Sequence, residues 1–177
     1  MALNVRRWCC EPIPEWIRRL ALGVTFCLVL TVIVPVAFGQ EDLRMVIVVH
    51  PLTPLAQVSS KELRDLYLGE TSRLGGTEMV PVNHAALTPI RRAFDKLVLH
   101  MNADEFAQAW KARRFLDPSQ KQPTVFRSIE SVKIFVAAEK GAIGYLPYSA
   151  VDATVRVVQK VDNIDIASKD YPLRMTP

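Results

Sequence analysis

The sequence predicts an α/β fold, because segments typical of buried strands alternate with segments typical of amphipathic helices. Residues 43–50 (L-R-M-V-I-V-V-H) contain a nearly continuous run of β-branched residues, which is typical of a strand buried on both faces. Residues 59–69 open with a helix-capping pattern and continue with apolar side chains at helical spacing. Residues 80–94 (V-P-V-N-H-A-A-L-T-P-I-R-R-A-F) have the pattern of a strand, a short loop and the start of a helix.

The first 39 residues predict a secretory signal peptide. Four arginines precede an uncharged apolar run over residues 20–38, and small residues close this run ahead of a cleavage site before Gln40. The run is also close to the length that spans a bilayer, so an uncleaved membrane anchor is the less favoured alternative. The predicted organisation is therefore a signal peptide at residues 1–39 and one domain at residues 40–177.

The composition of the domain excludes several classes of function. All three cysteines precede Gln40, so the mature chain would hold no disulfide, thiolate metal site or catalytic cysteine. The full chain has 22 basic and 18 acidic residues. The first 39 residues hold four of the basic and two of the acidic residues, so the domain at residues 40–177 has a formal charge of +2. So small a charge does not predict a nucleic-acid partner.

Neither a metal site nor an enzyme activity is predicted. His50, His84 and His100 lack the spacing of metal ligands. The sequence also contains no P-loop, no G-x-S-x-G motif and no other nucleophile–base pair that could be placed together. We therefore expect a protein without a cofactor that is not an enzyme.

The other elements follow from capping and turn signals along the chain. Gly75 and Gly76 mark a turn, and Asn102, followed by Glu105, marks a helix start. Ser128 is placed to cap a further helix. The elements predicted after residue 70 are strands at residues 79–82, 142–146 and 155–158, and helices at residues 89–100, 102–114 and 128–141.

The loop and helix start within residues 80–94 predict a candidate anion site. Thr88 is a favourable N-cap, and Pro89 suits the first helical position. A helix N-terminus presents backbone N–H groups with partial positive charge, and Arg91 and Arg92 add full charges in the first turn, which suggests a bound anion. The simpler alternative is a solvated arginine pair beside an ordinary cap, and these residues by themselves favour that alternative.

Four segments in sequence order resemble the phosphate-binding (PstS-like) periplasmic proteins of ABC transporters, which have the type 2 periplasmic binding protein fold. Each segment is a weak match alone, and together they cover roughly residues 45–174. The segments are S-S-K-E-L-R-D-L-Y-L-G-E at residues 59–70, V-P-V-N with T-P-I-R-R-A-F in residues 80–94, G-A-I-G-Y-L at residues 141–146, and the tail that ends with Y-P-L-R at residues 171–174.

The resemblance implies a reduced form of this fold, with one lobe or one lobe and part of the second. The family's proteins are much longer and bury their ligand in a cleft between two lobes. The resemblance also implies a periplasmic solute-binding protein that recognises phosphate or a similar oxyanion and is associated with ABC-type phosphate uptake or sensing. An ABC transporter permease or another envelope protein would then be a further partner.

The family's binding residues carry over only in part. Thr88 stands where the family has Ser, and Arg91 stands where it has Arg. The backbone after Asn83 and the side chain of His84 would adjoin the same anion, although a histidine that makes one hydrogen bond is the simpler interpretation of His84. Two further residues, Ser128 at a helix start and Thr53 after the first strand, are weaker candidates.

One departure from the family pattern predicts weakened binding. Pro89 and Ile90 replace the Gly and Thr of the family's loop, which removes one hydroxyl and one backbone N–H. An oxyanion needs many fixed donors to replace its hydration, so we expect phosphate binding that is weak or lost. The alternative function is an envelope interaction or sensing module that has the fold of a binding protein and no ligand.

Overall fold

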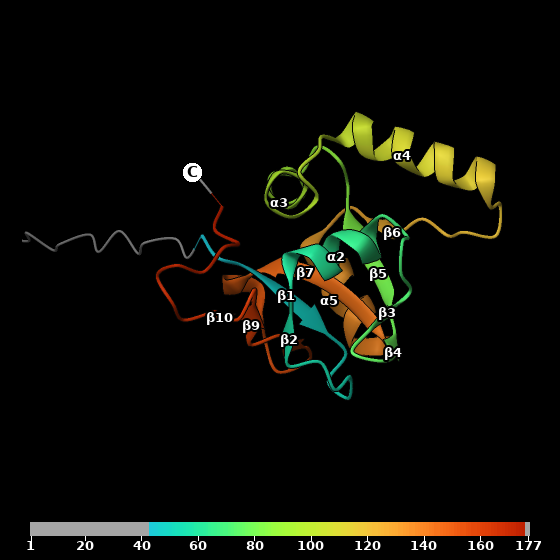
Figure 1. The fold of residues 1–177 in the computed structure, drawn as a ribbon. Helices are drawn as coiled ribbons and strands as arrows, with labels where there is room; N and C mark the ends of the chain where they lie inside the picture. Colours follow the sequence, from blue (N-terminus) through green and yellow to red (C-terminus); the bar gives the residue numbers. More distant parts are fainter. Residues whose placement is uncertain (1–42, 176–177) are drawn as a thin grey trace, which may run out of the picture. The chain divides into compact units, whose positions relative to one another are not determined.

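The computed structural model of the protein describes residues 43–175, and the predicted signal peptide at residues 1–39 lies outside them. Figure 1 shows the elements. The strands are β1 (Met45–Val49), β2 (Gln57–Val58), β3 (Arg73–Leu74), β4 (Thr77–Glu78), β5 (Val80–His84), β6 (Thr124–Phe126), β7 (Ala142–Pro147), β8 (Arg156–Val157), β9 (Lys160–Val161) and β10 (Ile164–Asp165). The helices are α2 (Ser60–Tyr67), α3 (Pro89–Phe94), the π-helical turn η1 (Asp95–Leu99), α4 (Ala103–Leu116), α5 (Ile129–Ala138) and the 3₁₀ turn η2 (Tyr148–Ala150).

The main sheet has five strands in the order β6-β5-β7-β1-β8. β5 is parallel to β6 and to β7, whereas β1 runs antiparallel to β7 and to β8. Every residue of β1 is buried, as the β-branched run predicted, because the strand lies inside the sheet and both of its faces are covered. The predicted α/β class is confirmed, with β1 as the antiparallel member of an otherwise parallel arrangement.

Helices cover both faces of this sheet, and Figure 1 shows α2 in front of it and α5 behind it. We call the side under α5 the aliphatic face. Its core side chains are Val46, Val48, Val82, Val132, Val136, Ala142, Leu146 and Val155. We call the other side, packed against α2, α3 and η1, the aromatic face. There the Phe94 ring stacks on Tyr145 with centroids 4.0 Å apart, and the Tyr67 ring lies 4.7 Å from Phe94.

Capping residues set the helix boundaries largely as predicted. Ser59 and Glu62 form a capping box at α2, and Asn102 and Glu105 form another at α4. The chain turns after α2 at Gly69, whose φ of +74° belongs to the left-handed region that glycine adopts without strain. A Cβ atom at Gly69 would also lie 2.7 Å from the Trp110 ring, so the close packing of α4 requires glycine here.

The two-residue strands β2, β3, β4, β9 and β10 were not predicted, and two further elements differ from the sequence prediction. The predicted helix at residues 89–100 changes from α to π geometry at Asp95 and ends at His100, a non-glycine residue with a φ of +52°. The strand β6 was not predicted, because three residues between polar loops carry little periodic signal. It forms because it can pair with β5, where His84 lies opposite Phe126.

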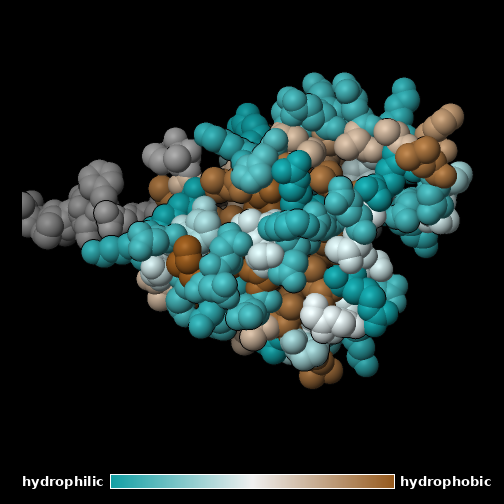
Figure 2. Space-filling view, in the orientation of Figure 1, coloured by the Kyte–Doolittle hydropathy of each residue, from teal (hydrophilic) through white to brown (hydrophobic). Residues whose placement is uncertain are grey.

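α4 is attached to the core along one side only. Phe106 and Trp110 are buried, and the Trp110 Nε1 group donates to the Tyr67 carbonyl at 3.1 Å. At its carboxyl end Phe115 and Leu116 are 87 % and 83 % exposed. Figure 2 shows apolar side chains at that end of α4 on a surface that is otherwise mostly polar. Within residues 43–175, no helix has the length and apolar character needed to cross a membrane.

Candidate functional site

The carboxyl ends of β5 and β6 lie side by side, because the two strands are parallel neighbours. The loop at residues 85–88 follows β5, and the start of α5 follows β6. The Ala85 N–H donates to the Phe126 carbonyl at 2.9 Å, and this bond joins the loop after β5 to the end of β6. In open α/β sheets, ligands bind outside the carboxyl ends of the strands. We call the loop at residues 85–88 together with residues 127–131 the carboxyl edge.

Thr88 occupies the predicted N-cap position of α3, but its side chain caps nothing. Its hydroxyl donates to the Ala85 carbonyl at 2.8 Å, and its backbone N–H donates to the same oxygen at 3.0 Å. These two bonds close the loop on itself. Thr88 therefore holds the shape of the carboxyl edge and presents a half-buried hydroxyl there.

Ser128 caps α5 as predicted and lies exposed at the carboxyl edge. Its Oγ accepts from the Ser131 N–H at 3.1 Å and lies 2.7 Å from the Ser131 Oγ. The N-terminus of this ten-residue helix carries partial positive charge, which favours an anion. Glu130 in the first turn opposes that charge, although its carboxylate lies 3.0 Å from the Lys133 ammonium group.

Arg127 is a residue of the carboxyl edge that the sequence predictions missed. It is exposed, it directly precedes the cap Ser128, and it forms no ion pair within residues 43–175. Its place follows from β6, which brings residue 127 beside the loop after β5. The triplet Thr-Val-Phe ahead of a Ser cap was the only signal in the sequence that could have indicated this strand.

Arg91 is an interior residue, only 3 % exposed. Its Nε donates to Asp95 Oδ1 at 2.6 Å, its Nη1 donates to the His84 carbonyl at 3.3 Å, and its guanidinium lies 4.5 Å from the centre of the Phe106 ring. The alternative of a solvated arginine pair therefore fails for Arg91 and fits only Arg92, which is exposed. A direct contact between Arg91 and an anion stays a prediction.

Asn83 and His84 are buried beneath the carboxyl edge, with exposures of 0 % and 1 %. Asn83 Oδ1 accepts from the Tyr145 hydroxyl and from the His84 N–H, the latter at 3.1 Å. His84 Nε2 lies 2.9 Å from the Tyr145 carbonyl, which can only accept, so Nε2 carries the proton. The His84 ring thus makes one hydrogen bond, as the simpler interpretation of this histidine predicted, but the residue lies at a strand end and not in a loop.

Burial fixes the charges of this network. It lowers the pKa of His84 below its ordinary value, and the nearby Arg91 cation lowers it further, while the bond to the Tyr145 carbonyl opposes both effects. Burial also raises the pKa of Asp95 against the opposing effect of Arg91, and it raises the pKa of the Tyr145 hydroxyl. The network therefore combines the hydrogen-bonded pair of Arg91 and Asp95 with a histidine and a tyrosine whose neutral forms burial favours.

Thr53 lies at the opposite end of the sheet from the other predicted residues. It follows β1, which runs antiparallel to β7, whereas β5 runs parallel to β7. Thr53 is 4 % exposed, and its carbonyl accepts from Arg156. The structure therefore brings Thr88 and Ser128 together at the carboxyl edge, places Asn83, His84 and Arg91 beneath it, and separates Thr53 from all of them.

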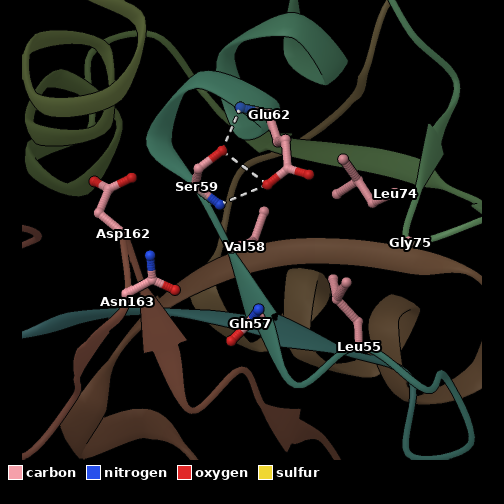
Figure 3. Close-up of a pocket in the computed structure, with 9 residues that line it drawn as sticks. All are labelled: Leu55, Gln57, Val58, Ser59, Glu62, Leu74, Gly75, Asp162 and Asn163. Atoms are coloured by element: carbon pink, nitrogen blue, oxygen red, sulfur yellow. Dashed lines mark hydrogen bonds between the residues drawn. The ribbon is translucent and has the colours of Figure 1, made fainter.

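A pocket of about 360 Å³ at the start of α2 involves none of the predicted residues (Figure 3). Two of its lining side chains are the acids Glu62 and Asp162, which repel an anion. Glu62 is held by the capping box with Ser59, and Asp162 accepts from Ser60 N and Oγ. Among residues 43–175 there is also no cluster of three or more histidine, cysteine or acidic side chains that could hold a metal ion.

No family model matches the sequence, and no curated protein matches it. Solved structures do match the fold. The chain is similar to PstS from Borrelia burgdorferi, with a TM-score of 0.59 and 15 % identity over 75 % of this chain and 55 % of that one. The fold is that of the PstS-type phosphate-binding proteins.

Two further structures agree with this assignment of the fold. One is a protein from Clostridium perfringens assigned as a phosphate ABC transporter substrate-binding protein, with bound phosphate. It matches with a TM-score of 0.56 and 20 % identity over 69 % of this chain and 46 % of that one. The other is an ABC-type phosphate transport receptor from Vibrio cholerae, with a TM-score of 0.51 and 18 % identity over 66 % and 46 % of the two chains.

The chain therefore spans about half the length of these PstS-type structures. The described residues form one main sheet with helices on both faces, and the reduced form of the fold predicted from the sequence is confirmed. These neighbours are a substrate-binding protein, a transport receptor and a PstS protein.

Proposed function

We propose that this protein is a single-lobe oxyanion-binding domain that takes phosphate or a similar anion at the carboxyl edge. The observation that supports the proposal is that the loop after β5 and the segment after β6 meet at one end of the sheet. The loop at residues 85–88 and the N-terminus of α5 meet through the bond from Ala85 N to Phe126 O. The neighbour from Clostridium perfringens, which shares this fold, holds bound phosphate, and this supports the same class of ligand here.

In this proposal the exposed groups of the edge contact the anion. Thr88 donates its only hydroxyl proton to the Ala85 carbonyl, so it acts through the shape of the loop. Ser128 supplies a hydroxyl donor, Arg127 supplies positive charge from the edge itself, and Arg92 supplies a second cation from the first turn of α3, directly after the loop. Charged hydrogen bonds from arginine to an oxyanion are about twice as strong as neutral ones, so these two side chains matter most. Neither arginine has an acidic partner within residues 43–175 that would have to be displaced.

Arg91 and the buried network act indirectly in this proposal. Arg91 Nη1 holds the carbonyl of His84, the last residue before the loop. Asn83 and Tyr145 fix the same strand end from the interior. These residues would set the loop position, and a change at any of them would alter affinity through the shape of the carboxyl edge.

Calorimetric titration of the purified protein with phosphate, sulfate and arsenate tests the proposal. We expect saturable binding of one anion, weakened about tenfold or more in Arg127→Gln, because a charge-assisted bond contributes about 1.5–3 kcal/mol. Lys140→Gln is the matched control, since Lys140 is also exposed and lies beyond the far end of α5. A folded protein that takes up none of these anions contradicts the proposal.

The predicted signal peptide at residues 1–39 supports a further part of the proposal, namely export to the periplasm and association with ABC-type phosphate uptake or sensing. A transporter permease would be the membrane partner. Fractionation of cells that express the full chain, followed by mass measurement of the mature protein, tests export. A periplasmic protein that begins at Gln40 is the expected result, and retention of residues 1–39 in the membrane fraction contradicts it.

The second candidate function is an envelope interaction module without a ligand. It is favoured by the exposed Phe115 and Leu116 on α4 and by Pro89, which removes a donor from the loop. Cross-linking in intact cells through a photoreactive residue at position 115, with position 52 as control, distinguishes this candidate. A specific protein adduct at position 115, together with absent anion binding, would favour it.

A further inference from the structure

A cavity of about 740 Å³ adjoins the carboxyl edge on the side of α3. Ala86 and Leu87 of the loop form part of its wall, and the turn from η1 into α4 forms another part. Ala86 and Leu87 therefore belong both to the carboxyl edge and to the wall of the cavity. A single tetrahedral oxyanion would leave most of a space of this size empty, whereas organic ligands occupy pockets of about 300–1,000 Å³.

The walls of this cavity combine positive charge with apolar surface. Arg92 and Lys96 lie one helical turn apart, are exposed, and form no ion pair within residues 43–175. Leu87, which is 86 % exposed, and Met101 supply apolar surface. Of the acidic side chains that line the cavity, Asp95 is already paired with Arg91, so Asp104 is the one that remains.

The backbone around this cavity is irregular. The helix that carries Arg92 and Lys96 changes to a π turn at Asp95–Leu99, and His100 at its end has a φ of +52°. π turns within helices are frequent at functional sites. This π turn leads from α3 to His100, which lines the cavity.

We propose that this cavity receives the organic body of the ligand, so that the preferred substrate class is a phosphate monoester with an apolar or aromatic group, which binds more tightly than inorganic phosphate. This inference rests on the proposed function, because the phosphoryl group would bind at the carboxyl edge near Arg92. A single lobe offers few donors to replace the hydration of a free oxyanion. Burial of an apolar body against Leu87 and Met101 would supply the missing binding free energy.

Calorimetric titrations with inorganic phosphate and with phenyl phosphate test the inference. We expect phenyl phosphate to bind about tenfold more tightly than phosphate, since burial of a small part of a ring is worth about that factor. The gain should fall to about twofold or less in Leu87→Ser. Leu52→Ser is the matched control, because Leu52 is also exposed and lies beyond β1 at the other end of the sheet.

The outcomes separate this inference from the proposed function. Saturable phosphate binding without a gain for phenyl phosphate overturns the inference and leaves the proposed function standing. If neither ligand binds, both the proposed function and the inference are contradicted. A gain that persists unchanged in both Leu87→Ser and Met101→Ser places the ring elsewhere and overturns the inference. Binding of both ligands, with phenyl phosphate about tenfold tighter and the gain lost in Leu87→Ser, supports it.

Discussion

The two faces of the main sheet are built from different chemistry, although the same strands form both. The aliphatic face under α5 is a core of valine, alanine and leucine without a buried charge. The aromatic face under α2 and α3 contains the buried polar residues Asn83, His84, Arg91 and Asp95. Polar groups are costly to bury unless they are paired, so their concentration on one face indicates a local requirement. That requirement is the support of the loop at residues 85–88, which leaves the sheet on this side.

The largest expected effect is the loss of the buried ion pair on the aromatic face. Arg91→Leu leaves the Asp95 carboxylate buried without a partner, so the free energy of unfolding should fall by about 3–5 kcal/mol. Urea denaturation followed by circular dichroism measures this change. The double variant Arg91→Leu/Asp95→Leu should recover most of the loss, and a double variant no more stable than the single one would contradict the explanation.

A packing change gives the corresponding test on the aliphatic face. In Gly144→Ala the added Cβ would lie 2.9 Å from Val82 and 3.1 Å from Val132, both of them branched side chains with little room to move. We expect a loss of about 1–3 kcal/mol in the free energy of unfolding, since overpacking forces neighbours from their rotamers. The loss in Gly144→Ala/Val132→Ala should be smaller than the sum of the losses in the two single variants, and additive losses would exclude crowding against Val132 as a cause.

A smaller effect is expected from one hydrogen bond of the aromatic face. Tyr145→Phe removes the hydroxyl that donates to Asn83 Oδ1 and keeps the ring stacked on Phe94. The free energy of unfolding should fall by about 1–2 kcal/mol, while Tyr148→Phe at an exposed position should have no measurable effect. If the two variants are equally stable, the interior hydroxyl contributes nothing to the fold.

The smallest effect is a dependence of stability on pH below 6.5 that comes from a histidine of the aromatic face. Burial lowers the pKa of His84 from its ordinary 6.5, so below pH 6.5 the unfolded chain binds a proton that the folded chain excludes. The free energy of unfolding should therefore fall as pH drops from 6.5 toward the folded pKa, by at most about 1.4 kcal/mol per pH unit.

The matched variant for this dependence is His84→Gln, which can still donate to the Tyr145 carbonyl and does not titrate. Asp95 acts with the opposite sign at lower pH, because its folded pKa is raised above 3.8 and the folded chain then binds the extra proton. The comparison therefore uses the difference between the two proteins over pH 5–7. Equal pH slopes for both would show that His84 is not the group responsible.

Sequence reasoning located the local signals on both faces but not the long-range pairs. Capping residues, β-branched runs and helical spacing are local properties, so Ser59, Asn102 and Ser128 were placed correctly. The interior position of Arg91 depends on Asp95 one turn later and on Phe106 in the next helix, and an i,i+4 pair does not reveal whether it is buried. The position of the exposed Arg127 depends on β6, and β6 is a strand only because it pairs with β5.

The resemblance to PstS-like proteins predicted the reduced fold, and the structural neighbours confirm it. It could not separate Thr53 from the other candidates, because the order of segments along a chain does not show which end of a strand each one reaches. The antiparallel direction of β1 decides that question. Topology, more than residue type, therefore determined which predicted site residues the structure brings together.

The position of β1 in the sheet has a consequence for the order of events in folding. Met45 pairs with Pro147 and Val49 with Arg156, so the first described strand finds its partners only near the end of the chain. Contacts between residues distant in sequence slow folding, because the intervening chain must be ordered before they form. During synthesis the apolar segment Met-Val-Ile-Val-Val would remain unpaired until β7 and β8 are available. Until then it is open to aggregation or to capture by a chaperone.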